Sequence, residues 1–314
     1  MGLTLVEASK LSNDVLSQGI VETFVRDDPI LERIGWIDIP GNALKYDRET
    51  TEADAEFKNV NDTWTPTNQE VTQYTATLKI VGNAVRLDDF LRSTRSNINN
   101  LKAELIAGNI KAVKKTFMNA FYYGNETSNP KEFDGLHTLI SSTTYNTIEA
   151  DPSDAESVAL SLSGHLDQAL DMIKGFKPSI IVSSKQLRRG VTKYLRSVGS
   201  INTGRDEFGR PIMSYGANDT PWYTSDYITN TEATSSGAYS AKTGGNTTSI
   251  FVLSFDPVGL QGCQNRVMEA TPWIPVPGTN AEESLIRWYP SIMMKSLVSC
   301  TKIVGIDADG TVTA

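Results

Sequence analysis

Residues 72–81 read TQYTATLKIV. Alternate positions of this stretch form two sets. The first is Thr72, Tyr74, Ala76, Leu78 and Ile80, and the second is Gln73, Thr75, Thr77, Lys79 and Val81. A period of two is typical of a β-strand that has one apolar face. The pattern therefore predicts a strand over residues 72–81.

The segment before this strand cannot bury itself. Residues 46–68 are rich in Thr, Glu, Asp and Asn, and their large apolar anchors are Phe57, Val60 and Trp64. If the strand pairs back with residues 43–49, the intervening chain forms a long protruding hairpin. Because isolated two-stranded ribbons are marginal in water, we expect a partner subunit to support this one, with Phe57 and Trp64 as the anchors.

A long amphipathic helix is predicted after the hairpin. Its apolar residues recur at steps of three and four between Ser96 and Gly124, which are suitable capping residues: Ile98, Leu101, Leu105, Ile106, Val113, Phe117 and Phe121. At 1.5 Å per residue, residues 97–123 would span about 40 Å. The helix is either a strut or an ordinary core helix, since periodicity does not separate the two.

The rest of the chain predicts a compact mixed domain. Helices over residues 154–174 and 185–198 flank a buried strand at residues 180–182. Residues 229–249 form a polar loop, and strands follow at 249–254 and at 284–306, where Pro290 interrupts the alternation. A short helix over residues 5–18, stopped before Pro29, belongs to an N-terminal arm.

Composition excludes several classes of protein. The chain has 314 residues, 39% of them apolar, and a formal net charge of -8, which disfavours a free-standing nucleic-acid binder. Neither an apolar run of about 18 residues nor a signal peptide is present. We therefore expect a protein made in the cytoplasm, with no membrane partner.

Catalytic and cofactor motifs are missing from the sequence. The two histidines, His137 and His165, accompany no nucleophile elbow, and with Cys263 and Cys300 they match no zinc-ligand spacing. Neither Gly-x-Gly-x-x-Gly nor a Walker sequence occurs. The sequence therefore predicts no catalytic residue, no metal and no cofactor.

Basic residues cluster on the helix at 185–198. Arg189, Lys193 and Arg196 follow one another at steps of four and three, so they share a face. This face contacts an acidic neighbour or packaged nucleic acid, or it is an ordinary solvated face. Farther on, Arg205 and Arg210 flank Asp206 and Glu207, a mixture that suits salt bridges between subunits.

The order of these elements resembles the major capsid proteins of tailed bacteriophages. Their Hong Kong ninety-seven capsid fold is also that of encapsulins, and the resemblance covers nearly the whole chain. It is carried by TATLKIVGNAVRLDDF, by NINNLKAELIAGNIKAVKKTFMNAFYYGN running into FDGLHTLI, and by PSIIVSSKQLRRGVTKYLR, FGRPIMSYG and ESLIRWYPSIMMKSLVSCTKIVGI.

The resemblance implies an α+β fold with five parts. They are an N-terminal arm at 1–40, an extended β-hairpin loop at 41–83, a peripheral domain at 84–153 with a spine helix at 96–124, an axial domain at 154–272, and a C-terminal return to the peripheral domain at 273–314. Phe57, Lys58, Trp64 and the basic residues Arg189, Lys193, Arg196, Arg205 and Arg210 are then candidates for the subunit interface.

The implied function is a structural one. Copies of the chain would assemble into hexamers and pentamers that form an icosahedral head shell around double-stranded DNA, held without sequence-specific binding. A separate scaffolding protein, a portal and a decoration protein are the further partners, and the virion is the expected location. An isopeptide cross-link through Lys58 is the less favoured alternative to noncovalent locking.

Three other classes compete with this interpretation. An encapsulin-type compartment would share the fold, a tail or baseplate protein would suit the Thr/Ser/Asn-rich strands, and an α/β enzyme would need the missing motifs.

Overall fold

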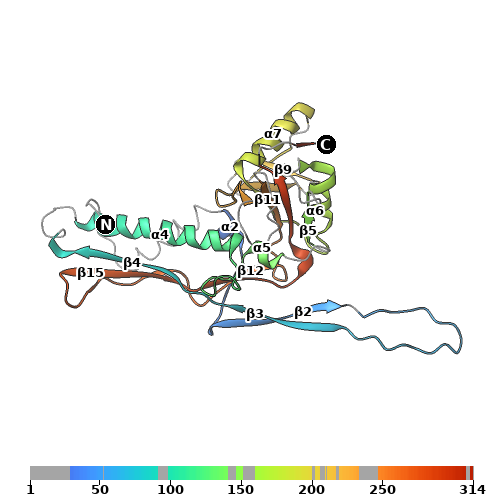
Figure 1. Cartoon of the computed structure of the whole chain (residues 1–314), viewed down its shortest axis with the longest axis horizontal. Coiled ribbons are helices and arrows are strands. Elements are labelled where there is room, and N and C mark those ends of the chain that lie inside the picture. The colour runs from blue at the N-terminus through green and yellow to red at the C-terminus, as the bar shows by residue number, and fades with distance from the viewer. Residues whose placement is uncertain are drawn as a thin grey trace.

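The computed structural model describes residues 29–51, 53–90, 98–140, 146–150, 160–199, 202–205, 209, 211–216, 219–232, 247–308 and 312–313. The predicted helix at 5–18, the Ser96 cap and Arg210 lie outside these residues, as does most of the predicted arm. Figure 1 shows an elongated molecule: a long helix backed by strands extends to one side, a hairpin extends to the other, and a mixed α/β unit rises above their junction. Among the helices of the described residues, none is long and apolar enough to span a membrane.

One long arm is built from a helix and a sheet. Helix α4 (Ile98–Tyr123) lies along β4 (Val81–Asp88) and β15 (Ala281–Trp288), which pair antiparallel over eight residues. The short strands β13 (Glu269–Ala270) and β14 (Ile274–Pro275) pair with β15. The predicted helix at 97–123 is thus confirmed, and it is a strut that buries one face against a sheet.

Aromatic packing holds this arm together. Phe117 of α4 is fully buried, and its ring centroid lies 4.5 Å from that of Trp288 and 5.5 Å from that of Phe133. The helix ends where Gly124 donates its N–H to Ala120 and accepts one from Gly135. A Cβ at position 124 would lie 2.3 Å from the carbonyl oxygen of Phe133, so only glycine fits there.

The hairpin consists of β2 (Ala43–Thr51) and β3 (Glu70–Thr77), paired antiparallel with Ala43 opposite Thr77. The predicted pairing is confirmed, but the predicted single strand over 72–81 is wrong. The chain changes partner between Thr77 and Val81, because the N–H of Lys79 bonds to Pro290 O and β4 then pairs with β15. Ile80 therefore leaves the expected buried face and is 81% exposed.

A small sheet joins the hairpin to the body. It contains β1 (Trp36–Asp38), β12 (Leu260–Gln264) and β16 (Pro290–Met294) in that order, and α2 (Pro29–Arg33) precedes it. Proline fits as the first residue of β16 because β16 is an edge strand. Ala76 of the hairpin packs with Ile39, Cys263 and Met293 in a separate small core.

The mixed unit contains a seven-stranded sheet in the order β5-β17-β11-β7-β10-β9-β8. Its strands are β5 (Thr147–Glu149), β7 (Ile180–Ser183), β8 (Asn202–Arg205), β9 (Pro211–Tyr215), β10 (Thr220–Thr224), β11 (Thr247–Leu253) and β17 (Thr301–Asp307). All seven residues of β11 are buried, which places it at the centre of the core.

Helices complete this unit. Helix α7 (Lys185–Val198) begins at Ser184, whose hydroxyl accepts the N–H of Leu187, and ends at Gly199 with φ 75°. Shorter elements are β6 (Leu160–Ser161), which pairs with β18 (Val312–Thr313), a π-helix at Leu162–Asp167, α6 (Gln168–Asp171), α5 (Leu136–Leu139) and a 3-10 turn at Leu297–Ser299.

The predicted helix at 154–174 differs from the structure. Residues 154–159 lie outside the described residues, and the described helical turns run from Leu162 to Asp171, first as a π-helix. The chain then turns at Gly175, which has φ 77°. The strand-like sequence predicted at 284–306 is confirmed, with the expected interruption at Pro290: β15 ends just before this residue and β16 begins at it, and β17 follows with other partners.

The C-terminal segment is shared between the two units. Strands β14 and β15 belong to the long arm, whereas β17 lies between β5 and β11 in the seven-stranded sheet. Residues 274–307 therefore tie the arm and the mixed unit into one body.

We expect Phe117→Ala to lower the free energy of unfolding by about 3–5 kcal/mol, because it empties the centre of the aromatic cluster. Urea denaturation of the unassembled chain measures this. Thr116→Ala, on the exposed face of α4 one residue away, is the control and should change stability by less than about 0.5 kcal/mol. Equal effects of the two would contradict the assigned core.

Candidate assembly surfaces

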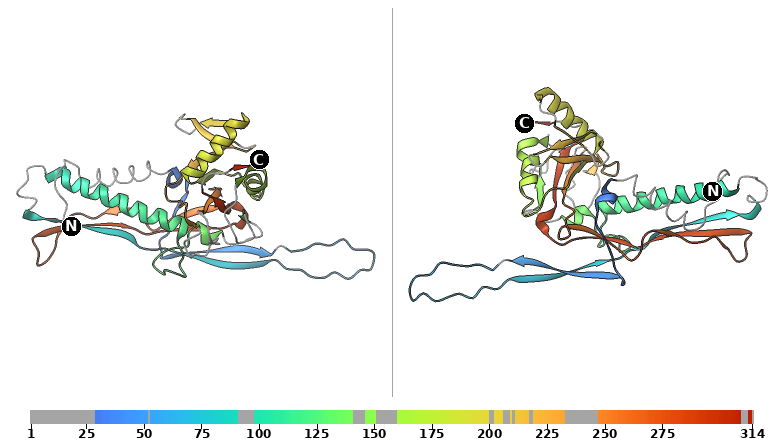
Figure 2. Two further views of the ribbon diagram at one scale, coloured as in Figure 1. Left: turned by 45° about the horizontal axis from the view of Figure 1, so that its top comes forward. Right: turned by 180° about the vertical axis from the view of Figure 1, so that it is seen from behind.

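The end of the hairpin presents apolar side chains without cover. In the isolated chain Phe57 is 107% exposed, Val60 90% and Trp64 68%. The loop nevertheless has a defined shape. The N–H of Asn59 bonds to Asp62 Oδ2 at 2.8 Å, and the Thr67 hydroxyl bonds to Asp54 O at 2.7 Å, which links the outgoing and returning segments of the loop. Figure 2 shows from two directions that this loop projects away from the body.

Lys58 lies in the same loop, as predicted for a cross-linking residue. Its Nζ is 2.5 Å from Glu56 of the same chain. The geometry within one chain therefore describes an ion pair.

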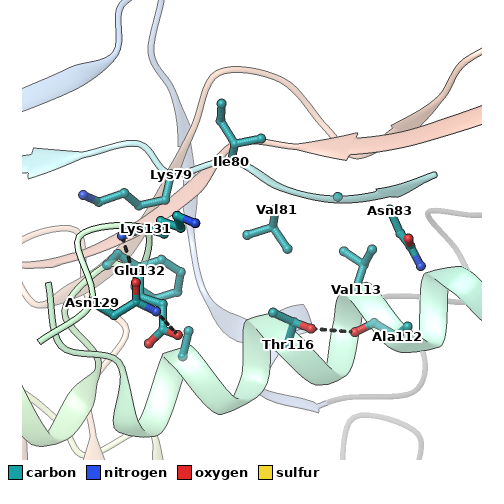
Figure 3. Close-up of a pocket in the computed structure, with 13 residues that line it drawn as sticks. Lys79, Ile80, Val81, Asn83, Ala112, Val113, Thr116, Asn129, Lys131 and Glu132 are labelled. Atoms are coloured by element: carbon teal, nitrogen blue, oxygen red, sulfur yellow. Dashed lines mark hydrogen bonds between the residues drawn. The ribbon is translucent and has the colours of Figure 1, made fainter.

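A groove of about 340 Å³ opens where β4 meets α4 and the loop at residues 129–133. Figure 3 shows Val81 of β4 and Val113 of α4 in the space between the strand and the helix, with Lys79 and Lys131 at one end. Lys79 is bound to Glu126 at 2.6 Å and to Pro130 O at 2.9 Å. The groove thus combines an apolar floor with a rim of mixed charge, because Glu132 also lines it.

The mixed unit carries the predicted basic face. Leu187, Val191 and Leu195 bury one side of α7. Arg189, Lys193 and Arg196 are exposed on α7, and Arg205 is exposed at the end of β8. The structure thus brings the three α7 residues onto one accessible face, while Arg210 lies outside the described residues.

A buried polar cluster lies between the arm and the mixed unit, and the sequence did not predict it. Glu232 accepts hydrogen bonds from the hydroxyls of Tyr123 at 2.7 Å and Ser249 at 2.5 Å. His137 Nε2 lies 3.5 Å from Glu232, and the ammonium of Lys302 bonds to His137 O at 2.9 Å. Glu232 lies between β10 and β11, and the other side chains come from the end of α4, from α5, from β11 and from β17.

Burial controls the proton equilibria of this cluster. It lowers the pKa of His137 despite the opposing effect of Glu232, and it lowers the pKa of Lys302 to about 8. The pKa of Tyr123 is raised, first by burial and then by the charge of Glu232. Glu232 is only 3% exposed, and its distance of more than 90 residues from Tyr123 and His137 explains why no local motif could reveal it.

Neither cysteine forms a disulfide. Cys263 and Cys300 are free and buried, and burial raises the pKa of each thiol to about 11. Within the part of the chain that the structure describes, no three His, Cys, Asp or Glu side chains gather as a metal site would require.

The model of the family "Major capsid protein GP7" matches residues 13–170. The chain belongs to this family. It is therefore a shell-forming capsid protein and a component of the virion capsid. The family is one of structural proteins, which confirms the predicted resemblance to tailed-phage capsid proteins and disfavours the tail, baseplate and enzyme alternatives.

Solved structures show the same fold at low sequence identity. The capsid protein is similar to the holo-SrpI encapsulin of Synechococcus elongatus PCC 7942, with a TM-score of 0.64 at 13% identity over 91% of this chain and 89% of that one. It is also similar to the capsid of a native GTA particle, with a TM-score of 0.61 at 9% identity over 98% and 95%. A Mycobacterium phage Bobi structure has a TM-score of 0.57 at 13% identity over 94% and 99%.

These similarities confirm the predicted α+β capsid fold. At such low identity they show the fold alone, and no curated protein matches the capsid protein in sequence. The encapsulin alternative shares this fold, but the family match favours the viral capsid.

We expect the capsid protein to lose stability as the pH falls from 7 to 5. The pKa of His137 in the folded chain lies below the ordinary value of 6.5. As the pH falls, the unfolded chain therefore binds a proton before the folded chain does, which favours unfolding. Urea titrations at several pH values measure this loss. His137→Gln should flatten the pH dependence more than His165→Gln, because His137 is almost fully buried whereas His165 is only partly buried. An unchanged slope in His137→Gln would contradict the assignment.

Proposed function

We propose that copies of this chain assemble into hexamers and pentamers that close an icosahedral head shell around phage double-stranded DNA. The observation that carries the proposal is the uncovered apolar end of the hairpin in a chain of the GP7 capsid family. A soluble monomer gains nothing from exposing Phe57 and Trp64 on a rigid projection. A subunit that covers its neighbour buries both.

Charge supports a contact between the hairpin and a neighbour's long arm. Residues 47–62 contain six acidic residues against Arg48 and Lys58: Asp47, Glu49, Glu52, Asp54, Glu56 and Asp62. On α4 of the long arm, Lys111 and Lys115 are exposed. Lys114 is buried, and Lys102 pairs with Glu282 of the same arm. Opposite charges steer association and fix register.

The groove beside α4 is the proposed receptor for the hairpin end. Its floor is apolar where Phe57 and Trp64 need cover, and Lys131 on its mixed-charge rim offers one cation to the acidic loop. Because the hairpin and the groove are different surfaces of one chain, the contact is heterologous, and such a contact generates rings when its rotation closes. Rings of five and six are the units from which an icosahedral shell is built.

The proposed domains follow the expected order along the chain. The extended loop at 41–83 and the peripheral domain at 84–153 with α4 form the outer parts, and the axial domain at 154–272 meets its copies around the five-fold and six-fold axes. The C-terminal residues 273–314 return to the peripheral domain through β15, while β17 and β5 complete the sheet of the axial domain. Arg189, Lys193, Arg196, Arg205 and Arg210 are the proposed contacts between axial domains.

Other partners follow from the same function. A separate scaffolding protein would guide closure in the host cytoplasm, a portal would occupy one vertex, and a decoration protein would bind outside. The enclosed DNA would be held without sequence readout, because a net charge of -8 repels phosphate. Locking between subunits would be noncovalent, with no catalytic step.

Negative-stain electron microscopy of the purified protein tests the proposal. We expect closed shells, or rings of five and six subunits. Nuclease-protected DNA inside particles from infected cells supports a viral head, whereas protected protein cargo supports the encapsulin alternative. Small discrete oligomers under all assembly conditions would refute shell formation.

We expect the double variant Phe57→Ser/Trp64→Ser to fold normally and to assemble at least tenfold less efficiently, because both side chains are exposed in the single subunit. Sedimentation velocity measures the assembled fraction. Val258→Ser, which changes an apolar residue that is 57% exposed between β11 and β12, is the matched control and should assemble normally. Normal assembly of the double variant would show that the hairpin end is not an anchor.

A further inference from the structure

One side chain ties the hairpin to the body at the place where the hairpin departs. Arg48 of β2 donates from Nε to Lys295 O at 3.1 Å and from Nη2 to Met294 O. Both carbonyl groups lie at the end of the edge strand β16. A planar guanidinium can reach two acceptors at once, which fixes its orientation as well as its position.

Two tyrosines complete this contact. The Arg48 guanidinium lies 4.2 Å from the ring centroid of Tyr74 and 5.9 Å from that of Tyr46. The two tyrosines are directly opposite each other in the ladder, with ring centroids 6.0 Å apart and nearly parallel planes. The cation thus contacts both carbonyl groups of the body and aromatic rings of the hairpin.

The alternation along β2 shows that this contact belongs to one face of the hairpin. Leu44, Tyr46 and Arg48 are partly buried, whereas Lys45, Asp47 and Glu49 are exposed. Beyond this point the described residues 53–69 are exposed, apart from the partly buried Lys58. Arg48 therefore lies at the outer limit of the contact between the hairpin and the body. The part of the hairpin beyond it has little support from its own subunit.

The contact at Arg48 is important because the hairpin extends far beyond it. From Arg48 to Asn61 the chain can extend about 40 Å at 3.3 Å per residue. A rotation of about 10° at the base would displace the end of the hairpin by about 7 Å, more than the distance of about 4 Å over which side chains make contact.

We propose that Arg48 is the positioning residue that sets the direction of the hairpin, and thereby the site at which its end meets the neighbouring subunit. The second part of this statement rests on the proposed shell function. The first part concerns the single subunit and is independent of it.

Distance measurements between two spin labels test the direction directly. The labels are placed at Thr65→Cys in the exposed loop and at Lys111→Cys on the exposed face of α4. The native cysteines are buried with raised pKa values and should not react under native conditions. The full-length unassembled chain is measured by double electron–electron resonance.

We expect Arg48→Met to at least double the width of the distance distribution. Arg48→Lys should give an intermediate width, because one ammonium cannot bridge two carbonyls and stack on Tyr74 as a guanidinium does. Lys45→Met removes a positive charge from the opposite face of the same strand, and this control should retain the wild-type distribution. If Arg48 only stabilised the fold, Arg48→Met would lower the melting temperature without broadening the distance distribution.

Assembly provides the second measurement. Shells of wild-type diameter should decrease at least tenfold in Arg48→Met and should be unchanged in Lys45→Met. Wild-type widths and diameters in both Arg48 variants would overturn the inference. If Arg48→Met does not fold, Arg48→Lys and Tyr74→Leu decide it by the same criteria. If the wild type forms no shells, the proposed function fails, and the label distances still decide the role of Arg48.

Discussion

A two-stranded ribbon has two faces and no interior, so its apolar residues find cover only on another surface. In this protein the base of the hairpin finds that cover on its own body, where Ala76 packs with Met293 and Arg48 binds the end of β16. The outer part, with Phe57 and Trp64, does not. This division between a supported base and an unsupported end is what makes the chain a subunit of something larger.

The remainder of the structure gives the hairpin a rigid base. The long arm resists bending because α4 lies against the β4–β15 ribbon and its aromatic residues interlock with Trp288. The mixed unit is joined to the arm by the buried cluster around Glu232, which binds groups from four separate elements. A buried carboxylate of this kind is costly unless all its partners are in place, so the cluster favours one relative arrangement of the two units.

Local patterns predicted some elements well and others poorly, for physical reasons. The helix over Ile98–Tyr123 and the pairing of residues 43–49 with the following strand were recognisable, because each element buries one face and so repeats at its own period. The division of 72–81 at Lys79 was not, since alternation continues while the pairing partner changes from β2 to β15. Within 284–306, by contrast, Pro290 marked an interruption in the sequence, and β16 begins at this residue.

The sequence by itself determined that the hairpin would be long, acidic and tipped with apolar residues, because these are properties of composition and short-range periodicity. It also placed the basic residues of α7 on one face through their spacing. Only the tertiary structure decided that Arg48 meets the carbonyl groups of Met294 and Lys295, and that Glu232 meets Tyr123 and His137. These contacts join residues 95 to 247 positions apart, and chain topology, rather than local propensity, brings such residues together.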